Sequence, residues 1–299
     1  MTLVVPDNHR IKARLESLGV DCVERSVAES MKIRPLRIGI LNIMPKAQEY
    51  EVNLLEPLGR PILQIEPVWI RLKSHVYKST PHSHLDNLYV SFDEAAEKGI
   101  DALIVTGAPV ELMDFDEVHY WDELTRILAW SRERCVSTLG ICWGGLALAG
   151  VLGLKKTIYP RKIFGVYRLK NLDPHSLMTA GLDDVFDSPQ SRFAGIDDAA
   201  LEAARDRGLL NLLAWSKETG YVIFETPDHK MVMHLGHPEY IKRRLVDETL
   251  RDRRKGRTDV SDPVNFDLER PRNTWRAHRN AFFSSWVKMV YRRALGIEA

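Results

Sequence analysis

The 299-residue sequence is poor in cysteine, with only Cys22, Cys135 and Cys142. An odd number of cysteines at wide spacing argues against a disulfide framework, and no Cys-x-x-Cys or His-Glu-x-x-His pattern is present. His82 and His84 could suggest a metal, but they have no further cluster of metal ligands near them in the sequence. We therefore expect free thiols and no metal site.

The chain also lacks long hydrophobic runs and a large net charge. No apolar run approaches the roughly 20 residues that cross a membrane, and the N-terminus shows no signal-peptide pattern. The formal net charge of +1 gives no electrostatic reason to expect a nucleic acid or an anionic membrane as partner. These absences favour a cytoplasmic protein that acts on small molecules.

Short apolar segments alternate with helical periodicity in the first half of the chain. The predicted strands are 36–43, 63–72, 101–106 and 136–141, and the predicted helices are 47–57, 93–98, 117–134 and 143–152. This alternation is typical of a parallel sheet with helices on both faces. In 63–72 the alternation changes phase at Pro67, which indicates a bulge or an edge position.

Beyond residue 155 strand-like segments follow one another with few helices between them. They are 156–170, 209–215, 220–226 and 230–236, and they predict an antiparallel extension or edge. A charged helix over 239–256 and a helix rich in aromatic residues over roughly 274–295 follow, and the latter fits a core or a homodimer face. No long linker divides the chain. We predict a peripheral lead-in over 1–35 and a single α/β domain over 36–299.

The stretch Gly140-Ile141-Cys142-Trp143-Gly144 carries the strongest chemical signal. Glycines two residues before and after Cys142 allow a sharp strand-to-helix turn, which would expose the sulfur above a helix N-terminus and favour the thiolate. The backbone amide of Trp143 could then donate to an oxyanion. The alternative is a buried structural cysteine, which is our interpretation of Cys22 and Cys135.

A base for this thiol is predicted in the stretch from Gly236 to Tyr240. His237 and Glu239 are two residues apart, so in extended backbone their side chains leave on the same side, as suits a base and the carboxylate that orients it. A solvated loop histidine is the alternative, and His234 has the opposite parity and is expected to pack within its strand. The turn at Gly107-Ala108-Pro109 offers Ala108 or Val110 as a second oxyanion donor, unless it is a plain strand-to-helix turn.

The Gly-x-Cys-x-Gly motif with a distant His-Pro-Glu resembles the class I glutamine amidotransferase superfamily, although Leu146 stands where that superfamily usually has glutamine. A closer resemblance covers nearly the whole chain and is to the homoserine O-acyltransferases of methionine biosynthesis. The stretches that carry it are Ile33–Leu36, Leu41–Lys46, Thr106–Pro109 with Tyr120-Trp121, Cys142-Trp143, Gly165–Tyr167, Ser191-Arg192, Gly236–Tyr240 and Trp275-Arg276-x-His278.

This resemblance implies a fold and a set of functional residues. The fold would be α/β, class I glutamine amidotransferase-like (flavodoxin-like), with a mostly parallel sheet and C-terminal additions. Cys142 would be the acyl-thioester nucleophile, His237 the proton acceptor and Glu239 its partner. The residues expected to contact substrate are Lys162, Ser191 and Arg251. Acyl-CoA would be a co-substrate, with no bound cofactor.

The residue two positions after the Gly-Ala-Pro turn separates acyl donors in this family, and here it is Glu111. Glycine there accompanies succinyl-CoA and glutamate accompanies acetyl-CoA, because a glutamate fills space and repels a succinyl carboxylate. The expected reaction is acetyl transfer from acetyl-CoA to the hydroxyl of L-homoserine. Succinyl-CoA as donor, L-serine as acceptor, a glutamine amidase and a non-catalytic binding protein are the alternatives.

Overall fold

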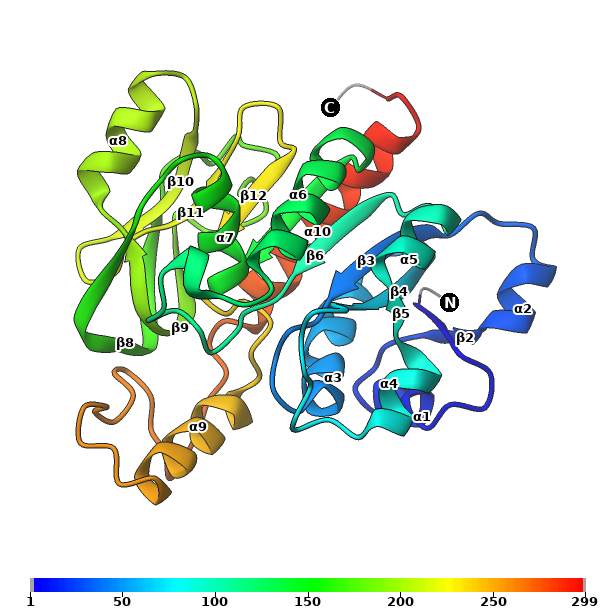
Figure 1. Ribbon diagram of the computed structural model, residues 1–299, viewed down its shortest axis with the longest axis horizontal. Helices are drawn as coiled ribbons and strands as arrows, with labels where there is room; N and C mark the ends of the chain where they lie inside the picture. Colours follow the sequence, from blue (N-terminus) through cyan, green and yellow to red (C-terminus); the bar gives the residue numbers. More distant parts are fainter. Residues whose placement is uncertain (1–2, 298–299) are drawn as a thin grey trace. The chain divides into compact units, whose positions relative to one another are not determined.

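The computed structural model describes residues 3–297, and the chain divides into two compact units. Within the described residues, unit 1 consists of 3–106, 119–138 and 283–297, and unit 2 consists of 107–118 and 139–282. Figure 1 shows the elements coloured along the sequence. Strand β7 (Ser137–Ile141) and helix α10 (Arg276–Ala294) each run from one unit into the other.

Unit 1 is a parallel α/β unit. Its strands are β1 (Leu3–Val5), β2 (Cys22–Glu24), β3 (Leu36–Leu41), β4 (Ile65–Arg71), β5 (Val90–Ser91) and β6 (Ala102–Val105). They pair in the order β2-β1-β4-β3-β6 with β5 beside β4, and the pairings between β1 and β2, β1 and β4, β3 and β4, β3 and β6, and β4 and β5 are all parallel. The predicted parallel sheet is confirmed.

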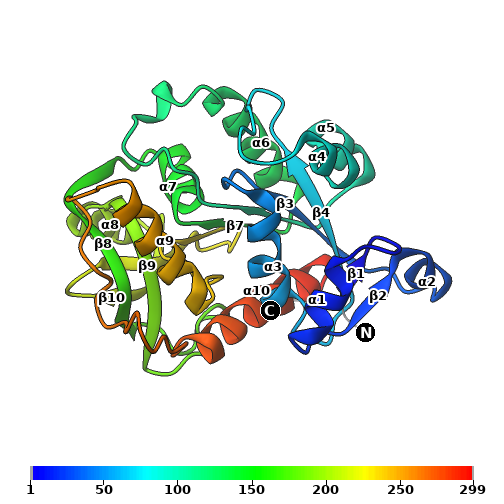
Figure 2. The same ribbon diagram turned by 90° about the horizontal axis from the view of Figure 1, so that it is seen from below.

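Helices cover both faces of this sheet. They are α1 (Ile11–Ser17), α2 (Arg25–Ser30), α3 (Ala47–Leu58), α4 (His82–Leu88), α5 (Phe92–Lys98) and α6 (Trp121–Arg134). Figure 2 shows α3 on one side of β3 and β4, with α5 and α6 on the other side. The side chains of β3 and β6 between these layers, such as Ile38, Ile40 and Ile104, are fully buried, which explains their nearly continuous apolar sequence.

Pro67 lies in the middle of β4, where the predicted bulge is absent but the alternative, a local edge position, is borne out. β4 pairs with β3 without a register shift, and Pro67 stands opposite Ile38. On its other side β4 pairs with β1 at Ile65 and with β5 at Ile70 and Arg71. Pro67 falls in the gap between these two short neighbours, so its missing N–H costs no ladder hydrogen bond there.

The segment interpreted as a lead-in contains regular structure. Leu3, Val4 and Val5 are buried in β1, which pairs with β2 and β4. Single-sequence reasoning missed this strand because three residues are too few to show alternation. The division into a lead-in and one domain over 36–299 stays a prediction.

Unit 2 is built on antiparallel strands. They are β8 (Lys156–Asn171), β9 (Val185–Ile196), β10 (Asn211–Ser216), β11 (Gly220–Glu225) and β12 (Met231–His234), in the order β12-β11-β10-β8-β9. All four pairings are antiparallel, as predicted for this half of the chain. The helices are α7 (Trp143–Val151), α8 (Asp198–Asp206), α9 (Lys242–Arg254) and the short 3₁₀ helix η1 (Phe115–Glu117).

Strand β9 was not predicted. It pairs with β8 over most of its length, and Figure 1 shows the two as a long hairpin. Ser188, Gln190, Ser191 and Arg192 are all buried in it, so polar residues occupy positions where alternation would place apolar ones. The sequence therefore lacks the period-2 pattern by which a half-buried strand is detected.

Among residues 3–297 no helix combines the length and the apolar character needed to cross a membrane.

Candidate active site

Cys142 occupies the turn between β7 and α7. Its φ of 53° and ψ of −115° are rare for a residue with a side chain, and such strain is concentrated at functional sites. Its backbone N–H donates to the carbonyl of His234 at 2.8 Å. A Cβ added at Gly140 would lie 2.5 Å from the carbonyl oxygen of Gly144, so the turn requires glycine at 140.

The expectation of an exposed sulfur is wrong in this structure. Cys142 is 5% exposed, and its side chain is hydrogen-bonded to His237. The histidine that would activate the thiol is therefore in direct contact with it. Cys22 and Cys135 are also buried, with their thiols directed at the backbone carbonyls of Val20 and Ile100, and burial raises the pKa of Cys22 to about 11, in agreement with a structural role.

His237 and Glu239 are in contact, as predicted. His237 Nδ1 lies 2.7 Å from Glu239 Oε1, and both side chains are buried. The backbone between them is not extended, because the Tyr240 N–H donates to the carbonyl of His237 at 3.1 Å and closes a turn. Since Nδ1 faces Glu239, Nε2 is the atom that faces Cys142.

The electrostatics of His237 favour the imidazolium. Burial by itself lowers the pKa of His237, but the sulfur of Cys142 and the carboxylate of Glu239 outweigh burial and raise it well above its ordinary value. His234, by contrast, has its pKa lowered to about 3, first by burial and then by His237. It is 2% exposed and stacks edge-on against Phe282, so the prediction that it packs within its strand is confirmed.

Lys162 and Ser191 meet at one buried carboxylate, Glu248 of α9. Ser191 Oγ donates to Glu248 Oε2 at 2.6 Å, and Lys162 Nζ lies 3.4 Å from the same oxygen. The Tyr240 hydroxyl donates to Glu248 Oε1. Burial works against the charged carboxylate, but Lys162, His237 and the two hydroxyls prevail and lower the pKa of Glu248 to about 2. Glu248 is therefore a permanent negative charge within this cluster.

Arg251 lies at the margin of this cluster. Its side chain is 47% exposed, and its Nε donates to Asp252 Oδ1 at 2.9 Å. Asp252 is buried and also lies 3.5 Å from Lys162 Nζ. The structure thus places Lys162, Ser191 and Arg251 around α9, with two acidic side chains between them.

Sequence reasoning missed Glu248 and Asp252. The signal was present, because they are four residues apart and so lie on one face of a helix, next to Arg251. In a helix as charged as Lys242–Arg254 this spacing was indistinguishable from a solvated ion-pair face. Only the fold shows that this face is buried against β8 and β9, as Figure 2 illustrates.

Glu111 lies in the turn that follows Gly107-Ala108-Pro109. Lys156 Nζ donates to its carbonyl oxygen at 2.8 Å. Its carboxylate oxygen Oε2 is buried without a hydrogen-bond partner among residues 3–297. Burial raises the pKa of Glu111, while a hydrogen bond from the backbone of Phe193 and the charges of Lys162 and His237 oppose the effect. A carboxylate is thus buried close to the candidate catalytic groups.

The two candidate oxyanion donors belong to the same unit as Cys142. Trp143 is the first residue of α7 and is fully buried, and Val110 lies in the turn before Glu111, where its carbonyl accepts from the Met113 N–H at 3.1 Å.

The described part of the chain, 3–297, contains no group of three or more His, Cys, Asp and Glu side chains arranged to hold a metal ion. His84, singled out as a metal candidate, has its Nε2 2.7 Å from Glu51 Oε1.

Known proteins are similar in sequence to nearly the whole of this chain. Residues 2–295 match the family model described as homoserine O-succinyltransferase. A homoserine O-acetyltransferase of Lachnospira eligens is 37% identical over 96% of this chain and 93% of that protein, and a homoserine O-succinyltransferase of Proteus mirabilis is 37% identical over 96% and 94%. A homoserine O-acetyltransferase of Bacillus subtilis is 36% identical over 96% of both chains.

Among solved structures, a glutamine amidotransferase of Thermotoga maritima is similar in fold. The TM-score is 0.58 at 12% identity, over 86% of this chain and 99% of that one. This likeness confirms the predicted α/β class I glutamine amidotransferase-like fold. The match to the family model over residues 2–295, together with relatives of 36–37% identity along nearly their whole length, shows that the chain belongs to the homoserine O-succinyltransferase family.

Proposed function

We propose that this protein transfers an acetyl group from acetyl-CoA to the hydroxyl of L-homoserine through a thioester on Cys142, in the cytoplasm. The observation that carries the proposal is the buried chain of contacts from Cys142 through His237 to Glu239. This arrangement of nucleophile, base and orienting carboxylate is the one used by cysteine acyltransfer enzymes in general.

In the first half of the reaction the Cys142 sulfur attacks the thioester carbonyl of acetyl-CoA. The backbone amides of Trp143 and Val110 are the proposed donors to the oxyanion, with Trp143 at the N-terminus of α7, where the helix dipole favours negative charge. When the tetrahedral intermediate collapses, the bond to CoA breaks and the His237 imidazolium supplies a proton to the departing thiolate.

In the second half His237 is neutral and accepts the proton from the homoserine hydroxyl. The hydroxyl oxygen then attacks the acetyl carbonyl on Cys142, and the thiolate leaves to regenerate the imidazolium–thiolate pair. Glu239 holds Nδ1 throughout, so Nε2 stays directed at the reacting atoms. No bound cofactor or metal takes part in this scheme.

The cluster around α9 is suited to an amino acid. Homoserine carries an ammonium and a carboxylate, and the cluster offers both signs of charge: Lys162 and Arg251 for the carboxylate, Glu248 for the ammonium. The hydroxyl of Ser191, 2.6 Å from Glu248, adds a neutral contact to the head group. L-serine would satisfy the same contacts but would bring its hydroxyl one methylene short of Cys142.

The choice of donor rests on Glu111. Relatives that carry the acetyltransferase and succinyltransferase names are equally identical to this chain, at 37%, so overall similarity does not separate the two donors. A buried carboxylate near His237 and Lys162 would repel the free carboxylate of a succinyl group. This favours acetyl-CoA.

The test is the intact mass of the protein after mixing with acetyl-CoA or succinyl-CoA in the absence of an amino acid. We expect an acetyl adduct that is lost on adding L-homoserine and that does not form on Cys142→Ala. A succinyl adduct in its place would overturn the assignment of the donor. No adduct from either donor, or undiminished turnover by Cys142→Ala, would overturn the mechanism.

A further inference from the structure

The turn that carries His237 also places an aromatic ring on the face of its imidazole. The ring centroids of His237 and Tyr240 are 4.0 Å apart with an interplanar angle of 22°, and both side chains are buried. The contact with Glu239 fixes one atom of the imidazole, but the χ2 torsion of a histidine is broad. A ring stacked on its face restricts this torsion. Together the two contacts define where Nε2 points.

Tyr240 is itself held at both ends. Its hydroxyl donates to Glu248 Oε1, and its backbone carbonyl accepts from Trp275 Nε1 at 2.6 Å. Trp275 is 1% exposed and stands directly before α10. One anchor comes from α9, eight residues further along the chain, and the other from Trp275, 35 residues away.

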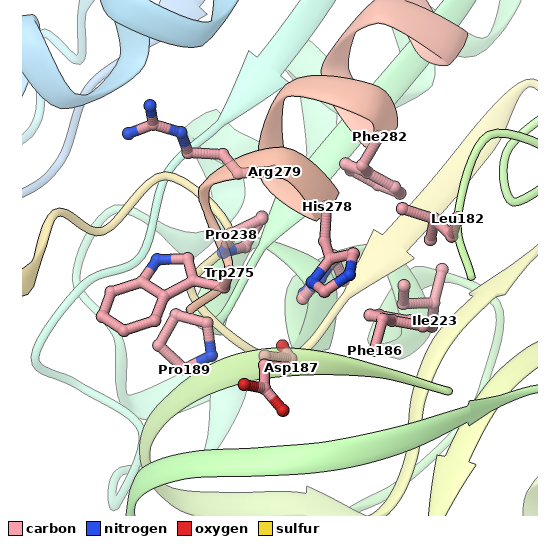
Figure 3. Close-up of a pocket in the computed structure, with 12 residues that line it drawn as sticks. Leu182, Phe186, Asp187, Pro189, Ile223, Pro238, Trp275, His278, Arg279 and Phe282 are labelled. Atoms are coloured by element: carbon pink, nitrogen blue, oxygen red, sulfur yellow. The ribbon is translucent and has the colours of Figure 1, made fainter. Parts of the chain in front are cut away.

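The space around Trp275 is tightly filled. Figure 3 shows Trp275, Pro189 and Pro238 among the residues that line one pocket, whose cavity volume is about 10 Å³. That is room for no more than one water molecule. The carbonyl of Pro189 also accepts from the His237 N–H at 2.8 Å, so the backbone of the turn is fixed by β9 as well.

We propose that Tyr240 is a positioning residue that keeps His237 aimed at Cys142, and that Trp275 and Glu248 hold Tyr240 in place. This inference rests on the proposed acyl transfer, since it concerns the histidine that moves the proton. Tyr240 acts through the imidazole in two ways. Its ring restricts rotation, and the negative face of the ring stabilises the imidazolium relative to the neutral form.

Other charged and titratable groups also act on His237 and would remain after Tyr240 is replaced. They are Cys142 at the start of α7, Glu239 in the turn, His234 at the end of β12, Glu111 in the Gly107–Val118 segment and Glu248 on α9. Tyr240→Leu and Tyr240→Phe both lose the hydroxyl bond to Glu248, so a change in pH dependence that appears in Tyr240→Leu and not in Tyr240→Phe reports the loss of the ring.

The experiment measures how fast L-homoserine discharges the preformed acyl-enzyme, as a function of pH, by intact mass. Only acylated protein is followed, so misfolded molecules do not contribute. For Tyr240→Leu we expect a limiting rate roughly 10–100-fold below wild type, as for a misdirected catalytic group. The rising limb of the profile should move to lower pH by about half a unit, because the imidazolium loses the ring face. Tyr240→Phe keeps the ring and should keep the position of the limb.

Tyr221→Leu is the matched control. Tyr221 is also a nearly buried tyrosine of unit 2 that donates to a carboxylate, Glu202 Oε1 at 2.9 Å. The acyl-enzyme of Tyr221→Leu should discharge at the wild-type rate. The rising limb of its pH profile should lie at the same pH as in the wild type. A Tyr240→Leu acyl-enzyme that behaves in this way would overturn the proposal.

Trp275→Phe keeps the test decisive if Tyr240→Leu does not fold. It removes the indole N–H that binds the Tyr240 carbonyl and should slow discharge several-fold, and an unchanged rate would overturn the proposal.

The experiment distinguishes failure of the proposed function from failure of the positioning role of Tyr240. If wild-type protein forms no adduct, the acyl-transfer function is wrong, whereas an adduct with normal discharge in the variants counts against positioning alone.

Discussion

Glu111 is the residue whose replacement should change specificity without removing catalysis. Glu111→Gly removes the buried carboxylate beside His237 and Lys162 and opens the space that a longer acyl group needs. We expect kcat/KM for succinyl-CoA to rise at least about 10-fold and kcat/KM for acetyl-CoA to fall, since a removed repulsion between like charges is worth more than 1 kcal/mol at a buried site. Steady-state kinetics with both donors measures the change.

Glu111→Gln is the matched control for this prediction, since it removes the charge but keeps the volume. It should gain less succinyl-CoA activity than Glu111→Gly if both charge and size matter. A Glu111→Gly enzyme with the wild-type preference would show that the donor is chosen elsewhere.

Glu239→Gln should separate the charge of the orienting group from its hydrogen bond. The amide oxygen can still accept from Nδ1, but the imidazolium loses a negative partner, so the pKa of His237 falls from its raised value. We expect kcat to fall by at least about 100-fold, within the range of general acid–base effects. The pH profile of kcat should move to lower pH, and an unmoved profile would contradict this role for Glu239.

The residues of the site differ in how far the sequence alone could identify them. Cys142, His237 and Glu239 lie in short motifs whose glycines and spacing carry chemical meaning by themselves. Lys162, Ser191 and Arg251 came only from family resemblance, because a lone lysine or serine has no local signature. Neither the local motifs nor the family resemblance identified Glu248, because its burial depends on how α9 packs against β8 and β9.

The turn between β7 and α7 leads to a prediction about the stability of two glycine variants. In Gly140→Ala the added Cβ would lie 2.5 Å from a backbone oxygen of Gly144, which cannot move without opening the helix. In Gly145→Ala the nearest atom, 3.1 Å away, is the flexible end of Leu235. We expect Gly140→Ala to lower the free energy of unfolding by about 2 kcal/mol or more and Gly145→Ala to cost less. Denaturant unfolding of both proteins measures the difference, and the opposite ranking would contradict the argument.

Helix α9 should make stability sensitive to acid. The pKa of Glu248 is lowered from 4.5 to about 2 in the folded protein, so its stabilising effect is complete above pH 4.5 and is lost as pH falls towards 2. Between about pH 6 and pH 3 the wild type should lose about 2 kcal/mol more unfolding free energy than Glu248→Gln, which has no charge to lose. Equal losses would show that Glu248 does not carry the effect.

At the scale of elements, prediction succeeded where one face of a segment was apolar. Strands β3, β4 and β6 of unit 1 and helices α3, α6, α9 and α10 were located within a few residues. β9 was missed because its buried positions are polar, and β1 because it is short. β9 forms by pairing with the preceding strand β8, and β1 forms by pairing with β4, which is distant in the chain.

The packing of helix α10 leads to a prediction about the stability of unit 1. Its last turns belong to unit 1, where Trp286 is fully buried and donates from Nε1 to Ser137 Oγ at 3.1 Å. Trp286→Ala should destabilise unit 1 by about 3–5 kcal/mol, the usual range for a buried tryptophan. Tyr291→Ala, at a position 36% exposed on the same helix, should cost far less. Unfolding monitored by hydrogen exchange in β3 and β6 tests both, and similar costs would contradict this assignment of α10.

The interleaving of the two units has a consequence for how the protein is made. Most of unit 1 precedes unit 2 in the chain, yet some residues of its core come from 283–297, which are synthesised only after unit 2. Domains usually fold on the ribosome in the order in which they emerge. Here the apolar strands of unit 1 stay incompletely covered until all of unit 2 has been translated. A ribosome stalled before residue 283 would hold a chain that depends on chaperones rather than a folded N-terminal unit.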